Sequence, residues 1–206
     1  VETEAREKAV KLARAVMTMI LLMLAAVVAL AFLGLETAVA WRHELSLSGR
    51  ALLTIRLIKT LLPYMIFICG AAFGMGVLNA MGRFKAAGFM PCLLNFFWIG
   101  ILAWIAFHPE LKLDQRIHRV AMAILVAGAA QMAYMLWRMH CAGVTPGVTF
   151  RGWGDAKVRL VWRNTAIAAV GAGAVQINYM LDTALAQIAA PWAAGVIGYA
   201  ERLMDL

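Results

Sequence analysis

Charged residues divide this sequence into long stretches of apolar residues. Five stretches contain no charged side chain over roughly 20 positions, namely Ala15–Leu35, Thr60–Gly82, Ala86–Phe107, Val120–Trp137 and Asn164–Leu181. A helix needs about 20 apolar residues to cross the hydrocarbon core of a bilayer, which is about 30 Å thick. Each stretch therefore predicts a membrane-spanning helix. The fifth is expected to continue past Asp182 to about Ala190, and Ala194–Leu206 is expected to begin a sixth span.

The apolar stretches favour helices over a transmembrane barrel. Their apolar residues are continuous, whereas the strands of a barrel alternate between lipid-facing and lumen-facing residues. Small residues that let helices approach closely recur within them, at Gly70, Gly74, Gly76, Gly128, Gly171 and Gly173. The prediction is an all-α, polytopic transmembrane helical bundle with five full spans and the start of a sixth.

Composition excludes a soluble globular protein. Hydrophobic residues make up 64% and charged residues 15% of the 206 residues, compared with about 45–50% and about 25% in soluble domains. The formal net charge is +8, but Lys and Arg lie mainly at the ends of apolar stretches, which disfavours a nucleic-acid-binding face. The three cysteines are scattered along the chain and predict neither a disulfide framework nor a metal site.

The distribution of Lys and Arg predicts the topology. With a cytoplasmic N-terminus, the inner segments carry 11 Lys and Arg residues and the outer segments carry 7, as the positive-inside rule favours. The amphipathic segment Gly49–Lys59 is expected to lie along the membrane interface before the chain turns at Pro63. The short connection Gly82–Gly88 predicts a tight helical hairpin, and Cys141–Gly154, which contains Pro146, predicts a loop between two bundles.

Two segments resemble one known family. Leu62–Gly100 reads LPYMIFICGAAFGMGVLNAMGRFKAAGFMPCLLNFFWIG and resembles the MurJ/MviN family of lipid II flippases. The matching positions are Pro63, Tyr64, Gly76, Leu78, Asn79, Arg83, Phe84, Pro91, Leu93, Leu94 and Asn95. Gln176–Asp205 is similar to the family's segment QIN-x-x-x-DT followed by YA-D-R-L-M-E, and Gln131 and Tyr134 fit a weaker family pattern.

This resemblance implies a fold of the multidrug/oligosaccharidyl-lipid/polysaccharide exporter superfamily, with two six-helix lobes around a central cavity and two extra helices. The chain would hold the third to seventh helices and the start of the eighth, as an internal piece of a longer protein. Residues 1–140 would be the remainder of the N-terminal lobe with four transmembrane helices, 141–160 a cytoplasmic loop between the lobes, and 161–206 the start of the C-terminal lobe.

The function implied by the resemblance is transport of lipid II, the lipid-linked peptidoglycan precursor, across the bacterial inner membrane by alternating access through a cationic cavity. Three alternatives stay open. One is a flippase or exporter of another polyprenyl-linked saccharide or of a drug, another is a membrane enzyme acting on undecaprenyl lipids, and the third is a non-transporting truncated scaffold. The sequence contains no catalytic motif of the HExxH or phosphate-loop type, so we expect a transporter and not an enzyme.

The resemblance also implies cavity residues. Arg202, beside Glu201, matches the family's acidic residue and Arg, and a planar guanidinium suits a pyrophosphate because it makes paired charge-assisted hydrogen bonds. The alternative for this pair is an ion pair at the membrane interface. Gln131 and Gln176 are mid-span amides for which cavity lining and helix packing are both open. Asn79 is a further candidate, for which an interhelical hydrogen bond or a helix cap is the alternative.

A cation site is implied around Asp182, the acid within the fifth apolar stretch. Asn178 lies one helical turn before it and Thr183 directly after it, and oxygen ligands of this kind suit coupling to Na⁺ or H⁺. The alternative is an acid exposed to water at the outer end of the span. No other cofactor is expected, and the expected partners are lipid II and membrane lipids.

Overall fold

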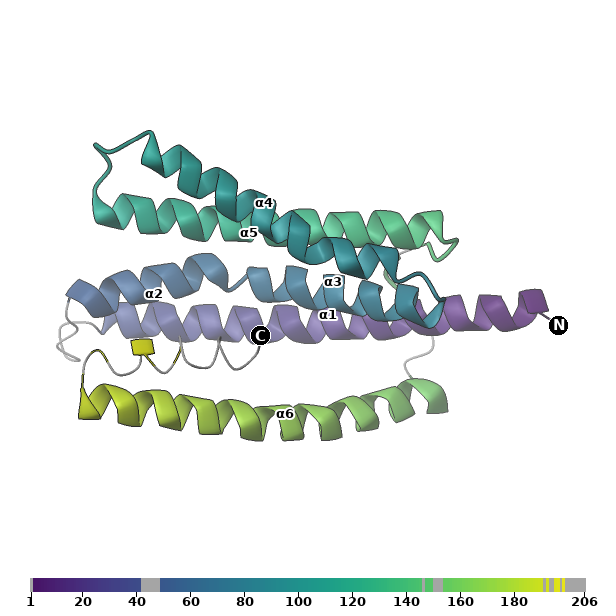
Figure 1. Ribbon diagram of the computed structural model, residues 1–206. Coiled ribbons are helices and arrows are strands. Elements are labelled where there is room, and N and C mark those ends of the chain that lie inside the picture. The colour runs from purple at the N-terminus through teal and green to yellow at the C-terminus, as the bar shows by residue number, and fades with distance from the viewer. Residues whose placement is uncertain are drawn as a thin grey trace. The chain divides into compact units, whose positions relative to one another are not determined.

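In the computed structural model, every secondary-structure element of the described residues is helical (Figure 1). The structure describes residues 2–41, 49–145, 147–149, 154–190, 192, 195, 196 and 198. The elements are α1 (Glu2–Ala40), α2 (Gly49–Leu61), α3 (Tyr64–Ala80), α4 (Lys85–Ala106), α5 (Leu113–Cys141) and α6 (Ala156–Ala189). The prediction of an all-α polytopic membrane protein is confirmed.

The chain divides into two compact units. The first, Val1–Trp153, contains α1 to α5, and the second, Gly154–Leu206, contains α6. Helix α6 begins at Ala156, which lies within the segment 141–160 expected to form a loop. Its first turn is capped by Asp155, whose side-chain Oδ1 accepts a hydrogen bond from the backbone N–H of Lys157 at 2.8 Å, the interaction that favours Asp at a helix start.

Four helical segments of the described residues are long and apolar enough to cross a membrane. They are Glu7–Ala40, Ala51–Ala80, Lys85–Ala106 and Leu113–Cys141. Among the described residues this is one fewer than the five full spans predicted. The expected fifth span, Asn164–Leu181, is helical within α6, but its polar residues Asn164, Gln176 and Asn178 lower its hydropathy. Most of the expected sixth span, Ala194–Leu206, lies outside the described residues.

Helix α5 is the central element of the first unit, because it packs against α2, α3 and α4, while α1 packs against α2 and α3. Two successive helices, α3 and α4, run in opposite directions and form the predicted hairpin (Figure 1). Large apolar side chains on α4 point outward, including Phe96 and Ile99, which are 73% and 68% exposed. Such an outward apolar surface is what a helix in contact with lipid requires.

Glycines allow α3 and α5 to approach closely. A Cβ atom placed on Gly128 of α5 would stand 2.5 Å from Cδ2 of Tyr64 on α3, which is closer than any side chain could tolerate. A Cβ atom on Gly74 would stand 3.1 Å from the sulfur of Met139, and Gly70 faces Met132 in the same way. The predicted packing role is confirmed at these three glycines. Apart from chain neighbours and the nearby backbone of the same helix, no described atom lies within 4 Å of a Cβ atom on Gly76, Gly171 or Gly173.

Two helices of the first unit end in Schellman motifs. After α3, Gly82 adopts a φ of +72°, its N–H donates to the carbonyl of Asn79, and the N–H of Arg83 donates to the carbonyl of Leu78 at 2.9 Å. Gly143 ends α5 in the same way with a φ of +79°. Only glycine adopts this backbone region without a steric cost, so these two glycines set where the helices stop.

The segment after α5 is fastened to α1. The side chain of Arg14 donates from Nε to the backbone carbonyl of Thr145 at 2.7 Å and from Nη2 to the hydroxyl of the same residue. The hydroxyl of Thr18, which is 2% exposed, accepts a hydrogen bond from the backbone N–H of Thr149 at 3.0 Å. The beginning of the predicted loop is therefore held against the first span.

The chain breaks at Pro63, as predicted, but α2 does not turn away from the bundle. Proline has no N–H and its ring clashes with the preceding helical turn, so α2 ends at Leu61 and α3 begins at Tyr64. Both helices pack against α1 and α5, and α2 continues in the direction of α3 (Figure 1). Together α2 and α3 make up Ala51–Ala80, which is long and apolar enough to cross a membrane, and the placement of Gly49–Lys59 along the membrane interface stays a prediction.

Candidate functional site

The predicted site residues are divided between the two units. Gln131 lies on α5 and Asn79 on α3, both in the first unit, whereas the remaining described candidates lie on α6. Glu201 and Arg202 lie outside the described residues. The described candidates therefore fall into two groups, one in each unit.

Gln131 joins α5 to α4. Its side chain is 3% exposed, and its Nε2 donates a hydrogen bond to the backbone carbonyl of Met90 at 3.0 Å. Met90 precedes Pro91, which lies inside α4 and removes one helical N–H donor. The hydrogen bond from Gln131 thus links α5 to α4 next to the position where Pro91 removes a backbone hydrogen bond of α4. The Oε1 atom of Gln131 is buried and has no hydrogen-bond partner among the described residues.

Asn79 lies in the last turn of α3, next to the α3–α4 hairpin. Its backbone carbonyl accepts the hydrogen bond from Gly82 that ends the helix, at 2.9 Å. Its side-chain Oδ1 is buried and has no partner among the described residues. Burying an amide oxygen without a hydrogen-bond donor costs free energy. A hydrogen-bond donor placed next to the side-chain oxygen of Asn79 or Gln131 would therefore be bound favourably.

The four candidates on α6 are arranged along one helix. Asn178 and Asp182 are four residues apart and therefore share a face, and both are exposed, as is Gln176. Thr183 is half-buried, and its hydroxyl donates to the backbone carbonyl of Tyr179 at 2.9 Å. The hydroxyl oxygen of Thr183 retains acceptor capacity, so three oxygen-bearing side chains lie within about a turn and a half of helix.

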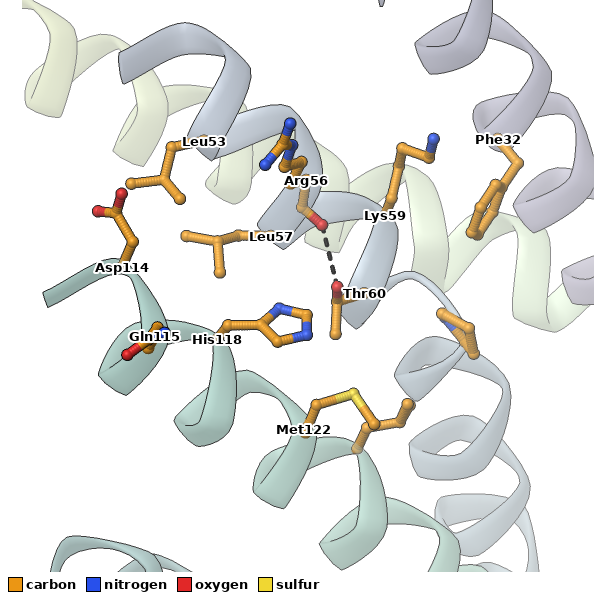
Figure 2. Close-up of a pocket in the computed structure, with 12 residues that line it drawn as sticks. Phe32, Leu53, Arg56, Leu57, Lys59, Thr60, Asp114, Gln115, His118 and Met122 are labelled. Carbon is orange, nitrogen blue, oxygen red and sulfur yellow. Dashed lines mark hydrogen bonds between the residues drawn. The ribbon is translucent and has the colours of Figure 1, made fainter. Parts of the chain in front are cut away.

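The first unit contains a pocket of about 690 Å³ between α1, α2 and α5 (Figure 2). Figure 2 shows Leu57 of α2 and His118 of α5 extending into the space between these two helices. The pocket lies at the opposite end of α5 from the α3–α4 hairpin. Its lining combines apolar and polar side chains, namely Phe32, Leu53, Arg56, Leu57, Lys59, Thr60, Pro63, Asp114, Gln115, His118, Met122 and Leu125.

Two of the lining cations differ in their surroundings. Lys59 forms an ion pair with Glu36 of α1, and its Nζ lies 5.8 Å from the centre of the Phe32 ring. Arg56, in contrast, has no hydrogen bond or ion pair from its guanidinium group to any described residue, although its backbone carbonyl accepts a hydrogen bond from the Thr60 hydroxyl at 3.0 Å. The pocket lining therefore combines the guanidinium group of Arg56, which is unpaired among the described residues, with apolar side chains.

Sequence reasoning missed this pocket. Arg56 and Lys59 lie in the segment expected along the membrane interface, and His118 is not among the candidate site residues of the sequence analysis. A signal was present, because Asp114, His118 and Met122 recur every four residues and so share one face of α5. The sequence pattern alone does not show that this face of α5 packs against α2.

Within the described ranges, no group of three His, Cys, Asp or Glu side chains is placed to hold a metal ion.

Comparison with known proteins relates the whole chain to one family. The family model described as lipid II flippase MurJ matches residues 1–206. A protein of Haemophilus influenzae named "Probable lipid II flippase MurJ" is 30% identical over 151 residues, which cover 72% of this chain and 28% of that protein. The lipid II flippase MurJ of Burkholderia cenocepacia is 26% identical over 74% of this chain and 30% of that protein.

A third relative, named "Probable lipid II flippase MurJ" in Vibrio cholerae, is 27% identical over 80% of this chain and 30% of that protein. The matched regions therefore span less than a third of the length of these curated relatives.

Proposed function

Because the chain belongs to the MurJ family of lipid II flippases, we propose that it is part of a protein that moves lipid II across the bacterial inner membrane. The observation that carries this proposal is the match of the family over residues 1–206. The four apolar helices that are long enough to span a membrane support it. The proposed activity is transport and includes no covalent step.

The proposed mechanism is alternating access through a cationic cavity between two lobes. Lipid II carries a pyrophosphate and a polar headgroup, which cross hydrocarbon only if polar groups replace their hydration. We assign the central contact to Arg202, with Glu201 beside it, because an ionisable pair within a membrane segment is costly unless it faces a cavity. The guanidinium would donate paired hydrogen bonds to the pyrophosphate.

We propose that three amides contribute to the polar lining. Gln176 is exposed on α6, so its side chain is free to face a cavity. Gln131 and Asn79 each have a buried side-chain oxygen without a partner among the described residues, which supports a contact with a donor from substrate or water. Amides suit a sugar–peptide headgroup because they both donate and accept hydrogen bonds.

We propose a cation site on α6 at Asp182, with Asn178 and Thr183 as neighbouring ligands. Asp182 and Asn178 share an exposed face, and the carboxylate supplies the charge that attracts Na⁺ or a proton. Further ligands would come from elsewhere in the protein. Binding of the ion would couple its gradient to the change between inward and outward states.

We propose that residues 1–140 belong to the N-terminal lobe, 141–160 to the cytoplasmic connection and 161–206 to the C-terminal lobe. The division of the chain between residues 153 and 154 supports this arrangement. The fastening of Thr145 to Arg14 supports a connection that starts against the first lobe.

The decisive experiment for the function is complementation of a strain depleted of its own lipid II flippase by the full-length protein. We expect the unmodified protein to restore growth and Arg202→Ala to abolish it, because a charge-assisted hydrogen bond of about 1.5–3 kcal/mol is lost. Arg202→Lys should restore growth only partly, because an ammonium group lacks the planar fork. Membrane insertion of every variant is checked by immunoblotting of the membrane fraction.

The matched control is Arg83→Ala, which removes an exposed arginine from the α3–α4 connection and should leave growth unchanged. Failure of the unmodified protein to complement would contradict lipid II transport and favour another polyprenyl-linked saccharide as substrate. Full growth with Arg202→Ala would remove this residue from the cavity while leaving the function in place.

The cation proposal is tested by transport in proteoliposomes with and without a Na⁺ gradient. Asp182→Asn nearly preserves shape but removes the charge, so transport should lose its dependence on the gradient. Asp155→Asn is the control, because Asp155 caps the same helix and asparagine caps equally well. Equal gradient dependence in the unmodified protein and in Asp182→Asn would exclude this acid from coupling.

A further inference from the structure

We propose that the pocket between α1, α2 and α5 binds one glycerophospholipid whose headgroup carries a phosphate and a primary ammonium group. Phosphatidylethanolamine has this chemistry. The proposal goes beyond lipid II transport, because none of the residues assigned above to substrate or cation lines this pocket. Its volume of about 690 Å³ falls within the range of about 300–1,000 Å³ that is usual for small-molecule sites.

The apolar wall of the pocket provides a surface for an acyl chain. Leu53 and Leu57 extend from α2, and Met122 and Leu125 line the pocket from α5 (Figure 2). Met122 is 43% exposed, so this wall is not covered by another helix of the first unit. Covering an exposed apolar surface with a lipid chain is favourable in proportion to the area removed from water.

The charged groups of the pocket match a zwitterion. Lys59 is already neutralised by Glu36, which leaves Arg56 on α2 and Asp114 on α5 as the two charges. Neither side chain forms an ion pair or hydrogen bond with a described residue. One positive and one negative group on facing helices suit a ligand that carries both charges, and they do not suit a simple anion.

Each headgroup charge has a chemically suitable partner. The guanidinium of Arg56 can donate two parallel hydrogen bonds to phosphate oxygens, and the ring of His118, which extends into the pocket (Figure 2), can donate one more. The carboxylate of Asp114 can accept from the ammonium N–H groups. Arg56 lines the pocket from α2 and Asp114 lines it from α5 (Figure 2), so the two charges of one headgroup can each meet a separate partner.

The position of the charged residues along the helices also agrees with a lipid headgroup. Charged residues gather at this end of the bundle, where Glu36, Lys59 and Asp114 lie near the ends or the break of the apolar helices. Such residues occupy the membrane–water interface because charges in the hydrocarbon are costly. Phospholipid headgroups lie at the same depth, so the ligand would reach the site without leaving its leaflet.

Native mass spectrometry of the intact protein tests the proposal. The purified protein is incubated with phosphatidylethanolamine, phosphatidylcholine or phosphatidylglycerol of identical acyl chains, and retained lipid is measured. We expect about tenfold more retention of phosphatidylethanolamine than of the other two, because one charge-assisted hydrogen bond corresponds to about that factor. Phosphatidylcholine lacks ammonium N–H donors, and phosphatidylglycerol lacks the positive charge.

Two variants of pocket residues test which part of the headgroup Asp114 and Arg56 each bind. Asp114→Asn should abolish the preference for phosphatidylethanolamine over phosphatidylglycerol, and Arg56→Gln should reduce retention of all three lipids about tenfold. Lys112→Gln is the matched control, because it removes one exposed cation near the same end of α5 without lining the pocket. This control should behave like the unmodified protein.

Equal retention of the three lipids by the unmodified protein would overturn the proposal without requiring any variant. A preference that persists in both Arg56→Gln and Asp114→Asn would also overturn it, because the lipid would then be bound elsewhere. Growth complementation by the same variants separates this outcome from the proposed transport function, which depends on other residues.

Discussion

At the end of the first unit where α3 meets α4, buried side chains form one continuous cluster, whereas at the other end α2 and α5 surround a pocket of about 690 Å³. The cluster consists of Ala71, Leu78, Ala86, Met90, Met135, Met139, Ala142 and Val144. Helix α5 runs through both ends. The difference therefore arises from the side chains that α5 presents along its length and from those it meets.

Small residues explain the packed end. Gly74 and Ala71 of α3 accommodate the long, adaptable side chains of Met135 and Met139, and methionine fills irregular spaces well. At the pocket end, the corresponding turns of α5 carry the polar residues Asp114, Gln115 and His118. Bulky polar groups cannot interdigitate without losing their hydration, so the helices there enclose space.

The sharpest test of this contrast is to truncate one leucine at each end. Leu78 is 1% exposed in the cluster, so Leu78→Ala should destabilise the protein by about 2–5 kcal/mol through lost burial and a new cavity. Leu57 already borders the pocket, so Leu57→Ala should cost less than about 1 kcal/mol because little packing is lost. Unfolding in mixed detergent micelles measures both. Equal losses would show that the two ends are packed alike.

A smaller effect is expected from adding a methyl group where α3 and α5 touch. Gly128→Ala would place Cβ 2.5 Å from the Tyr64 ring and should destabilise the protein by about 1–3 kcal/mol, the usual cost of overpacking. Gly76→Ala is the control, because no described atom lies within 4 Å of its Cβ. It should be neutral or slightly stabilising, since alanine is the better helix former. An equal loss in both variants would contradict the close contact.

The smallest effect is expected at the rim of the pocket. The pair formed by Lys59 and Glu36 is partly exposed, with side chains 24% and 56% accessible, so a double-mutant cycle with Lys59→Gln and Glu36→Gln should give a coupling of about 0.2–1 kcal/mol. The coupling should weaken in high salt because exposed charges are screened. A coupling above about 2 kcal/mol would show that this pair is far more buried than a rim position.

The helices of the fold were predictable because charge is costly in hydrocarbon. Arg83 and Lys85 separate two apolar stretches, and the structure places the α3–α4 connection there. The same reasoning underestimated the helices' length. Helix α1 extends back to Glu2, since helical hydrogen bonding continues through charged residues once the helix leaves the lipid.

The candidate site was less predictable, because its parts depend on helix packing. Gln131 was recognised as a mid-span amide, but only the position of α4 identifies Met90 as its acceptor. Arg56 and His118 are far apart in the sequence, and only the packing of α2 against α5 brings both to one pocket. The hydropathy pattern describes each helix separately and therefore contains neither contact.

The contact between Gly128 and Tyr64 also restricts how this sequence can change over generations. Every amino acid except glycine has a Cβ atom, so every missense mutation of the Gly128 codon produces the same collision. A lineage that replaces this glycine first must pass through an overpacked protein, and one that first makes Tyr64 smaller must pass through a protein with an empty space between α3 and α5. Either order therefore has a less stable intermediate, so the two positions are expected to change together or not at all.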